Sequence, residues 1–224
     1  MKPYILLIFI IYSCTLFANT PDKQENANSY LTGEIYADKI GIKGEQFYNK
    51  EWTNSQIGLS TGETVFNKKL KYNYMLDELI YFNETINQQV KLDKPLIKSF
   101  TIKNKQGEEK EFVKLNVNQE SFFAEVAVKG NLNLYIQHKT KIENNDVNID
   151  GSNYRQQTIV PQVIYYITTK ENQYFEIDKI SKKSILKIFP DKKDQLLRIL
   201  KSHNLKLKRE EDLVQFIEIL NEQL

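Results

Sequence analysis

The sequence contains few residues with the chemistry of a catalytic or metal site. Its two histidines, His138 and His203, are far apart, and no closely spaced pair of histidines exists that could begin a zinc site. Neither a Gly-x-Ser-x-Gly elbow nor a glycine-rich phosphate loop occurs. The sequence therefore predicts no catalytic residue, no metal ligand and no cofactor.

Adjacent acidic residues are the remaining candidates, because a glycosidase needs two carboxylates that face each other across a cleft. Among these pairs, Asp77 and Glu78 are the one worth testing, since they follow a strand rich in tyrosine. We favour a simpler interpretation, in which they form a turn and pair with Lys69 or Lys71. A hydrolase of envelope glycan is therefore the third of three functional hypotheses.

Tyrosine is abundant, with 13 residues in a chain of 224. Its ring combines apolar area with a polar tip, so it suits both cross-strand packing and a binding surface. We favour packing for most of these residues. Tyr72, Tyr74, Tyr81 and Tyr165 are kept as a speculative binding surface.

Residues 1–18 have the order of a secretory signal peptide, with a basic start, an apolar run at residues 5–11 and a small residue before a polar stretch. The apolar run is too short to cross a bilayer as a helix. We favour cleavage between Ala18 and Asn19. The alternative is a lipoprotein anchored at Cys14, although its neighbours are bulkier and more apolar than is usual there.

Cleavage at Ala18 would remove Cys14, the only cysteine, so the mature chain could form no disulfide and would depend on burial for its stability. The formal net charge of the whole chain is +2, which gives no electrostatic argument for a nucleic-acid partner. We therefore expect an exported protein of the periplasm or cell envelope, whose partners are envelope proteins.

Between residues 30 and 180 short apolar–polar alternation predicts an antiparallel sheet of about eight to eleven strands. The clearest strand covers residues 69–75. Gly107 predicts a hairpin turn between two further strands. Residues 139–157, which are rich in Asn, Asp and Lys, predict a long surface loop.

The hydrophobic period changes after the strands. Ser181 is expected to cap a helix over residues 182–188, a second helix begins near Pro190, and a third covers about residues 209–222. Strands that come first and helices that come last predict an α+β fold, with the helices packed on the sheet. The predicted organisation is a signal peptide (1–18), a flexible leader (19–29), a β domain (30–180) and a helical segment (181–224).

A set of short motifs, in order along most of the chain, resembles a family of uncharacterised exported proteins of the Bacteroidota. The motifs are the signal-peptide end Leu16-Phe17-Ala18 and residues 58–65, 69–79, 125–130, 163–167, 189–193 and 210–213. All are packing or turn motifs, and the family has no assigned activity. The resemblance implies an envelope location in a double-membraned bacterium and assigns no site residue.

Two functional hypotheses rank above the hydrolase. The leading one is a non-enzymatic binding or scaffold protein of the envelope that acts by protein–protein interaction. The alternative is a carrier of lipid or outer-membrane components, associated with the outer membrane, which requires an apolar cavity between the sheet and the helices.

Overall fold

The computed structural model describes residues 31–38, 41–171 and 173–223. The strands are β1 (Gly33–Ile35), β2 (Thr53–Leu59), β3 (Thr64–Asn73), β4 (Glu78–Asn83), β5 (Gln88–Leu92), β6 (Ile97–Lys103), β7 (Glu109–Val117), β8 (Glu120–Val128), β9 (Asn133–Ile149), β10 (Ser152–Thr168) and β11 (Tyr174–Ile177). The helices are α1 (Lys182–Ile188), α2 (Lys193–Ser202) and α3 (Glu210–Gln223), with short 3-10 turns η2 (Lys94–Leu96) and η3 (Pro190–Lys192).

The N-terminal predictions lie outside the described residues. These are the signal peptide with its cleavage between Ala18 and Asn19, the alternative lipidation at Cys14, and the leader over residues 19–29. Among the described residues, no helix is both long enough and apolar enough to cross a bilayer.

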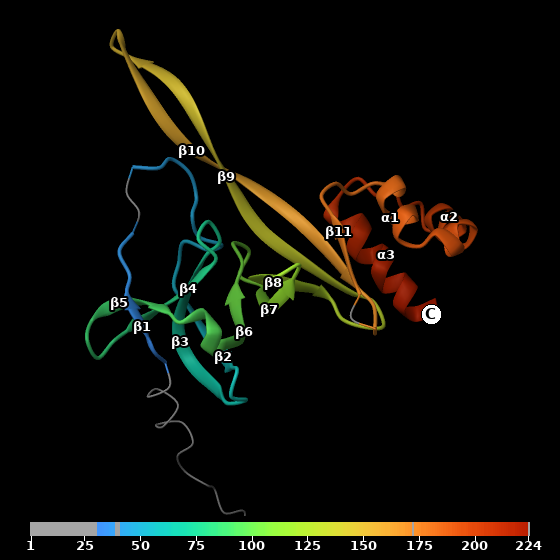
Figure 1. The fold of residues 1–224 in the computed structure, drawn as a ribbon, viewed down its shortest axis with the longest axis horizontal. Coiled ribbons are helices and arrows are strands. Elements are labelled where there is room, and N and C mark those ends of the chain that lie inside the picture. The colour runs from blue at the N-terminus through green and yellow to red at the C-terminus, as the bar shows by residue number, and fades with distance from the viewer. Residues whose placement is uncertain (1–30, 39–40, 172, 224) are drawn as a thin grey trace, which may run out of the picture.

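The eleven strands form one antiparallel sheet in the order β1-β5-β4-β3-β2-β6-β7-β8-β9-β10-β11 (Figure 1). Most neighbours in this order are also neighbours in sequence, as expected of a sheet built from hairpins. At the turn predicted from Gly107, this glycine has a φ of 84° and its N–H donates to the Asn104 carbonyl. The α+β class, a largely antiparallel sheet followed by C-terminal helices, is confirmed.

The first eight strands curl around an aromatic core. Phe100 on β6 and Phe112 on β7 stack with their ring centroids 5.0 Å apart. Tyr72 on β3 reaches Phe123 on β8 with a centroid separation of 6.1 Å, although three strands separate β3 from β8 in the sheet order. A flat sheet would keep these strands more than 15 Å apart, at about 4.8 Å per strand. The sheet is therefore strongly curved, and we call this part, β1 to β8, the β lobe.

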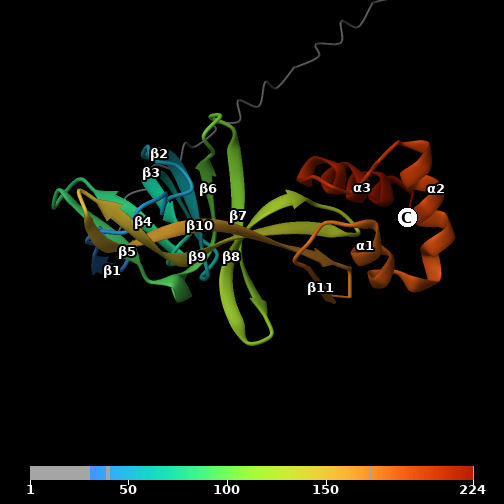
Figure 2. The same cartoon turned by 90° about the horizontal axis from the view of Figure 1, so that it is seen from above.

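The three C-terminal helices form a second lobe, the helical lobe (residues 181–223), at the opposite end of the molecule from β1 to β5 (Figures 1 and 2). Ser181 caps α1 as predicted, since its side chain accepts a hydrogen bond from the Ser184 N–H at 3.1 Å. Along α3, the predicted apolar stripe is buried against side chains from the inner ends of β9 and β10. The stripe consists of Leu213, Phe216, Ile217 and Leu220.

The prediction of a long loop over residues 139–157 is wrong. These residues belong to β9 and β10, two strands of 17 residues each that pair along their full length from Asn133–Thr168 to Ile149–Ser152. The outer half of this hairpin projects from the body as a two-stranded ribbon (Figure 1). The Asn-rich composition was misleading because neither face of the outer ribbon packs on a core, so the usual apolar alternation is weak there.

Candidate functional site

The four tyrosines predicted as a binding surface do not form one. Tyr72, Tyr81 and Tyr165 are buried and Tyr74 is half-buried. Their hydroxyls bind neighbouring groups: Tyr72 donates to Asp77 at 2.7 Å and Tyr165 donates to Glu210 at 3.0 Å. Burial, reinforced by the charge of Glu210, raises the pKa of the Tyr165 hydroxyl. These rings belong to the core because strand alternation turns them toward it.

The acidic turn after β3 has a structural role. Oδ1 of Asp77 accepts hydrogen bonds from the Tyr72 hydroxyl and from the Phe123 N–H at 3.1 Å, and Oδ2 binds Lys94. Glu78 lies 3.8 Å from a different lysine, Lys91. The acids thus pair with lysines as expected of a turn, but with other lysines than predicted.

The lysines named for that pairing have other partners. Lys69 binds Glu84 at 2.8 Å, and Nζ of Lys71 lies 4.8 Å from the ring centroid of Trp52. The prediction that Asp77 and Glu78 pair with Lys69 or Lys71 is therefore wrong, because the curl of the sheet brings η2 and β8 against the turn. Both carboxylate oxygens of Asp77 are engaged by bonds that join β3, η2 and β8.

The two histidines lie in different surroundings. His203 is exposed at the C-terminal end of α2, whereas His138 is half-buried on β9. Nε2 of His138 is 2.8 Å from Oε2 of Glu125, and the Tyr48 hydroxyl donates to the same oxygen at 2.9 Å. Lys110 lies 4.0 Å from the other oxygen of Glu125. This cluster joins β8, β9, β7 and the segment before β2, and sequence reasoning did not find it.

The charges in this cluster determine how Glu125 ionises. Burial alone would raise its pKa, but the hydrogen bond and charge of His138, together with Tyr48 and Lys110, hold the pKa below its ordinary value. Burial and the adjacent carboxylate raise the pKa of Tyr48, which therefore stays protonated and donates.

A pocket of about 270 Å³ opens beside this cluster, lined partly by Tyr48, Tyr74 and His138. Its described lining contains no serine, cysteine or carboxylate that the imidazole could activate. Within the described part of the chain, no three His, Cys, Asp or Glu side chains are grouped to hold a metal ion. The arrangement is suited to fixing strands in place.

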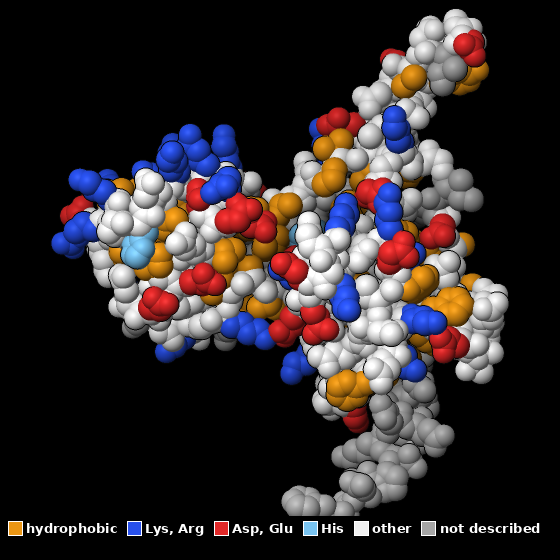
Figure 3. All heavy atoms as spheres, turned by 180° about the vertical axis from the view of Figure 1, so that it is seen from behind, with side chains coloured by type: hydrophobic (Ala, Val, Ile, Leu, Met, Phe, Trp, Pro, Cys, Tyr) orange, Lys and Arg blue, Asp and Glu red, His pale blue; other side chains and the backbone are white. Residues whose placement is uncertain are grey.

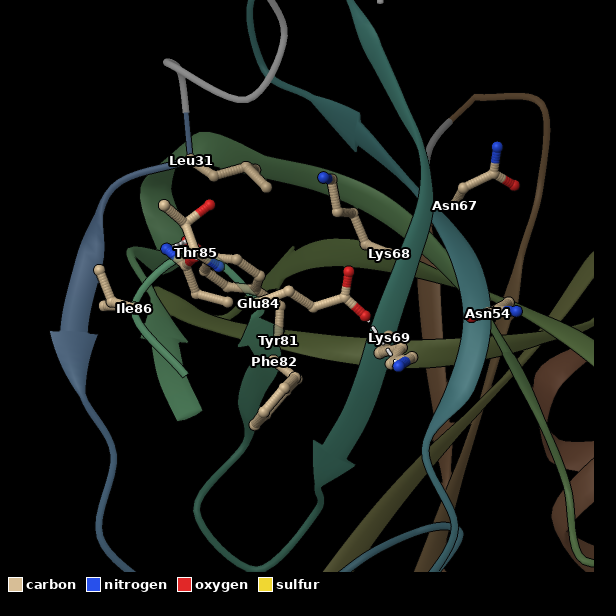
Figure 4. A pocket seen from close by; sticks show the side chains of 11 residues that line it. Leu31, Asn54, Asn67, Lys68, Lys69, Tyr81, Phe82, Glu84, Thr85 and Ile86 are labelled. Carbon is tan, nitrogen blue, oxygen red and sulfur yellow. Dashed lines mark hydrogen bonds and ion pairs between the residues drawn. The ribbon is translucent and has the colours of Figure 1, made fainter. Parts of the chain in front are cut away.

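Figure 3 shows the outer surface, on which Lys and Arg side chains gather over the helical lobe. A larger pocket, of about 650 Å³, lies in the β lobe between the β4–β5 turn and the β2–β3 pair (Figure 4). Lys69 and Glu84 form their ion pair among its lining residues, and Ile86 lines it from the turn. Those two charges neutralise each other, and Lys68 is the further charged side chain of the lining.

The protruding ribbon has the clearest features of a contact surface. We define the ribbon arm as residues 141–160, the outer parts of β9 and β10. Tyr154 is 56% exposed, and Ile142, which lies on the opposite face of the ribbon, is 42% exposed. Tyr154 pairs across the ribbon with Val147, so an aromatic ring and a branched side chain share one face.

Polar ladders on the opposite face stabilise the ribbon arm. Asn148 donates to Asn153 across the strands at 2.9 Å, and Arg155 lies 4.0 Å from Asp146. The turn at the tip places Asp150 at φ 51° and Gly151 at φ 81°. Two consecutive positive φ values are the conformation that a two-residue hairpin turn requires.

A local signal for this hairpin was present in the sequence. Asp150-Gly151 is among the strongest hairpin dipeptides, and the residues on both sides of it pair one to one. Tyr154 follows shortly after it, so identifying the turn would have placed this tyrosine on an exposed strand.

At its base the ribbon arm is fastened to the segment that precedes β2. The Lys43 N–H donates to the Gln157 carbonyl at 2.9 Å, and the Ile159 N–H donates to the Lys43 carbonyl at 2.8 Å. Gly44 packs against Ile159, since a Cβ added to Gly44 would lie 3.0 Å from the Cβ of Ile159.

Comparisons with protein-family models, curated proteins and solved structures found no significant match for the chain, so its function is argued from this geometry.

Proposed function

We propose that this chain is an exported, non-enzymatic binding protein of the cell envelope, which contacts another protein through the ribbon arm. One observation carries the proposal: the hairpin continues beyond the body and exposes Tyr154 there, on the face that this ring shares with Val147. The signal-peptide pattern of residues 1–18 and the resemblance to exported Bacteroidota proteins support the envelope location.

The arm adds little to the stability of the fold itself. A two-stranded ribbon is only marginally stable in water when neither face packs on a core. Such a ribbon becomes ordered at lower cost when a partner buries one face, and tyrosine is a residue type that contributes strongly to such contacts. The face that carries Tyr154 and Val147 is therefore the proposed contact face.

The other two hypotheses have weaker support. The carrier hypothesis requires an apolar cavity between sheet and helices, and buried side chains such as Leu134, Ile167 and Phe216 occupy that space. The hydrolase hypothesis depended on Asp77 and Glu78, and the carboxylate of Asp77 is engaged by Tyr72, Phe123 and Lys94.

Site-specific photocrosslinking tests the proposal. We would replace Tyr154 by p-benzoylphenylalanine, irradiate the mature protein in envelope extract and identify the adducts by mass spectrometry. The matched control carries the same probe at Gln106, which is exposed at another hairpin tip. We expect one dominant adduct from position 154 that is absent from position 106.

A competition experiment makes the result specific. An excess of unlabelled wild-type protein should suppress the adduct at least fivefold, whereas an excess of Tyr154→Ser should not. The same adducts from positions 154 and 106, or none from position 154, would contradict the proposal.

A further inference from the structure

Positive charge is concentrated in one part of this nearly neutral chain. Residues 181–209 contain ten Lys or Arg and two Asp, a net charge of +8. Helix α3 adds five acidic residues, so the helical lobe as a whole has a net charge of +3 and its excess of positive charge lies in residues 181–209. The composition of the whole chain hides this asymmetry, which is of the kind that indicates an anionic partner.

These ten cations all lie on the surface. Every one of them is exposed, and Arg209 is paired with Asp212 at 3.3 Å. Within the described residues, the other nine form no ion pair. They are Lys182, Lys183, Lys187, Lys192, Lys193, Arg198, Lys201, Lys206 and Lys208.

Lysines outside the helical lobe are more often paired. Seven of them, Lys50, Lys69, Lys91, Lys94, Lys110, Lys129 and Lys141, are within 4.0 Å of an Asp or Glu oxygen. The unpaired cations of the described residues are therefore concentrated on α1, α2 and the segment that follows α2, while the acids of the helical lobe lie mainly on α3. In Figure 3, Lys and Arg side chains gather at the end of the molecule at which Figure 2 places the helices.

Helix α2 adds an apolar side chain to this surface. Leu196, Ile199 and Leu200 face the core, whereas Leu197 is 37% exposed. Lys193 and Lys201 lie one turn before and one turn after Leu197, so they share its face of the helix. Leu197 therefore adds apolar area to a basic surface, and buried apolar area and attraction to anionic lipid together set how strongly a helix binds a membrane surface.

We propose that this basic surface of α1 and α2 docks on a membrane that contains anionic lipid. Eight of the ten cations are lysines, which act as point charges and lack the planar fork that arginine offers to one defined acidic group. Attraction that is spread over many lysines suits the diffuse charge of lipid headgroups. An acidic protein partner is less well matched, because protein interfaces favour arginine and aromatic residues over lysine.

Vesicle binding tests this inference, which is independent of the ribbon arm. The mature protein would be floated with vesicles of phosphatidylcholine alone or with about 30% phosphatidylglycerol. We expect at least tenfold stronger binding to the anionic vesicles, and a loss of most of it when NaCl is raised from about 50 mM to about 500 mM.

Two triple variants with equal changes in net charge locate the surface. Lys193→Gln/Arg198→Gln/Lys201→Gln should weaken binding to anionic vesicles about tenfold or more. Lys98→Gln/Lys103→Gln/Lys105→Gln, which removes three exposed lysines of the β lobe, should change it less than twofold. All six side chains are exposed, so circular dichroism should show both variants folded.

A separate substitution tests the apolar contact. Leu197→Ser should weaken binding about threefold while leaving its salt dependence unchanged. Equal losses in the two triple variants would overturn the proposal, as would no preference for anionic vesicles. Stronger retention on poly-glutamate or duplex DNA than on the vesicles would overturn it in favour of another anionic partner.

Discussion

Nε2 of His138 lies 2.8 Å from Oε2 of Glu125, so neighbouring strands β9 and β8 are joined by an acid–imidazole pair just before the ribbon arm begins. The Tyr48 hydroxyl donates to the same carboxylate oxygen. Through this one carboxylate, the segment before β2 is tied to the strand that leads into the arm. The pair thus positions the base of the arm.

The first prediction concerns the pH dependence of stability. The folded-state pKa of Glu125 lies below its ordinary value of 4.5, because the bonds from His138 and Tyr48 outweigh the effect of burial. A lowered pKa stabilises the fold above the ordinary pKa, and this stabilisation is lost as the pH falls through the folded-state pKa. Glu125→Gln should therefore lower the free energy of unfolding at pH 7 by about 1–3 kcal/mol.

Urea unfolding between pH 7 and pH 3 measures this effect. The wild-type protein should lose more stability below about pH 4.5 than Glu125→Gln does, so the two curves should converge in acid. Glu109→Gln, which changes an exposed carboxyl on β7, is the matched control and should follow the wild-type curve. Parallel curves for Glu125→Gln and wild type would contradict the prediction.

The second prediction concerns how much the hydrogen bonds and the ion pair of Asp77 each contribute to stability. This residue has a φ of 55°, which Asn tolerates well and Ala does not. Asp77→Asn can keep an acceptor for Tyr72 and Phe123, but it loses the partly exposed ion pair with Lys94. It should therefore lower the free energy of unfolding by at most about 1 kcal/mol. Asp77→Ala loses all three bonds and adds backbone strain, and should cost about 2–4 kcal/mol.

Chemical denaturation of both variants tests this ranking. Lys94→Gln removes the ion pair together with the hydrogen bond from Lys94 to the Ser121 carbonyl, so it should lower the free energy of unfolding at least as much as Asp77→Asn does. Equal destabilisation by Asp77→Asn and Asp77→Ala would show that the ion pair dominates, contrary to the argument.

Periodicity in the sequence was sufficient to identify the helices and strands that have one buried face. The stripe on α3 and the alternation of β3 are such elements, because burial against a core forces a regular apolar spacing. Apart from Ile159 at its base, the ribbon arm has no buried apolar side chain among those described, so its strands could be identified only from the Asp150-Gly151 turn. The Glu125–His138 pair depends on strand register, which brings together residues 13 positions apart and leaves no local signal.

The third prediction concerns the tip of the ribbon arm. Gly151 has a φ of 81°, so Gly151→Ala should strain the turn by about 1 kcal/mol. Because the arm lies outside the core, the melting temperature of the whole protein should stay within about 2 °C of wild type. Amide hydrogen exchange in residues 143–156 should accelerate about fivefold, since local opening becomes easier.

Mass spectrometry of hydrogen exchange, resolved by peptide, provides the test. Gly62→Ala is the matched control, because Gly62 also has a positive φ, 105°, in a different hairpin. It should accelerate exchange around its own turn and leave the ribbon arm unchanged. A loss of global stability in Gly151→Ala would show that the arm is part of the cooperative core.

The last prediction concerns how α3 is fastened to the sheet. Asn221 on α3 forms two hydrogen bonds with the backbone of Leu132, from the Leu132 N–H at 2.7 Å and to its carbonyl at 2.8 Å. A Cβ added at Gly130 would come within 2.5 Å of the Asn221 amide group. Gly130→Ala should therefore displace the amide, break both bonds and destabilise the protein by about 1–3 kcal/mol.

A double-mutant cycle distinguishes this displacement from a general effect of the methyl group. Asn221→Ala alone should cost about as much as Gly130→Ala, because each removes the same two bonds. If the amide is the only obstacle, adding Gly130→Ala to Asn221→Ala should cost less than about 0.5 kcal/mol more, giving a clearly non-additive cycle. Additive losses in urea unfolding would mean that Gly130 is needed for another reason, and that the contact with Asn221 does not fix the position of α3.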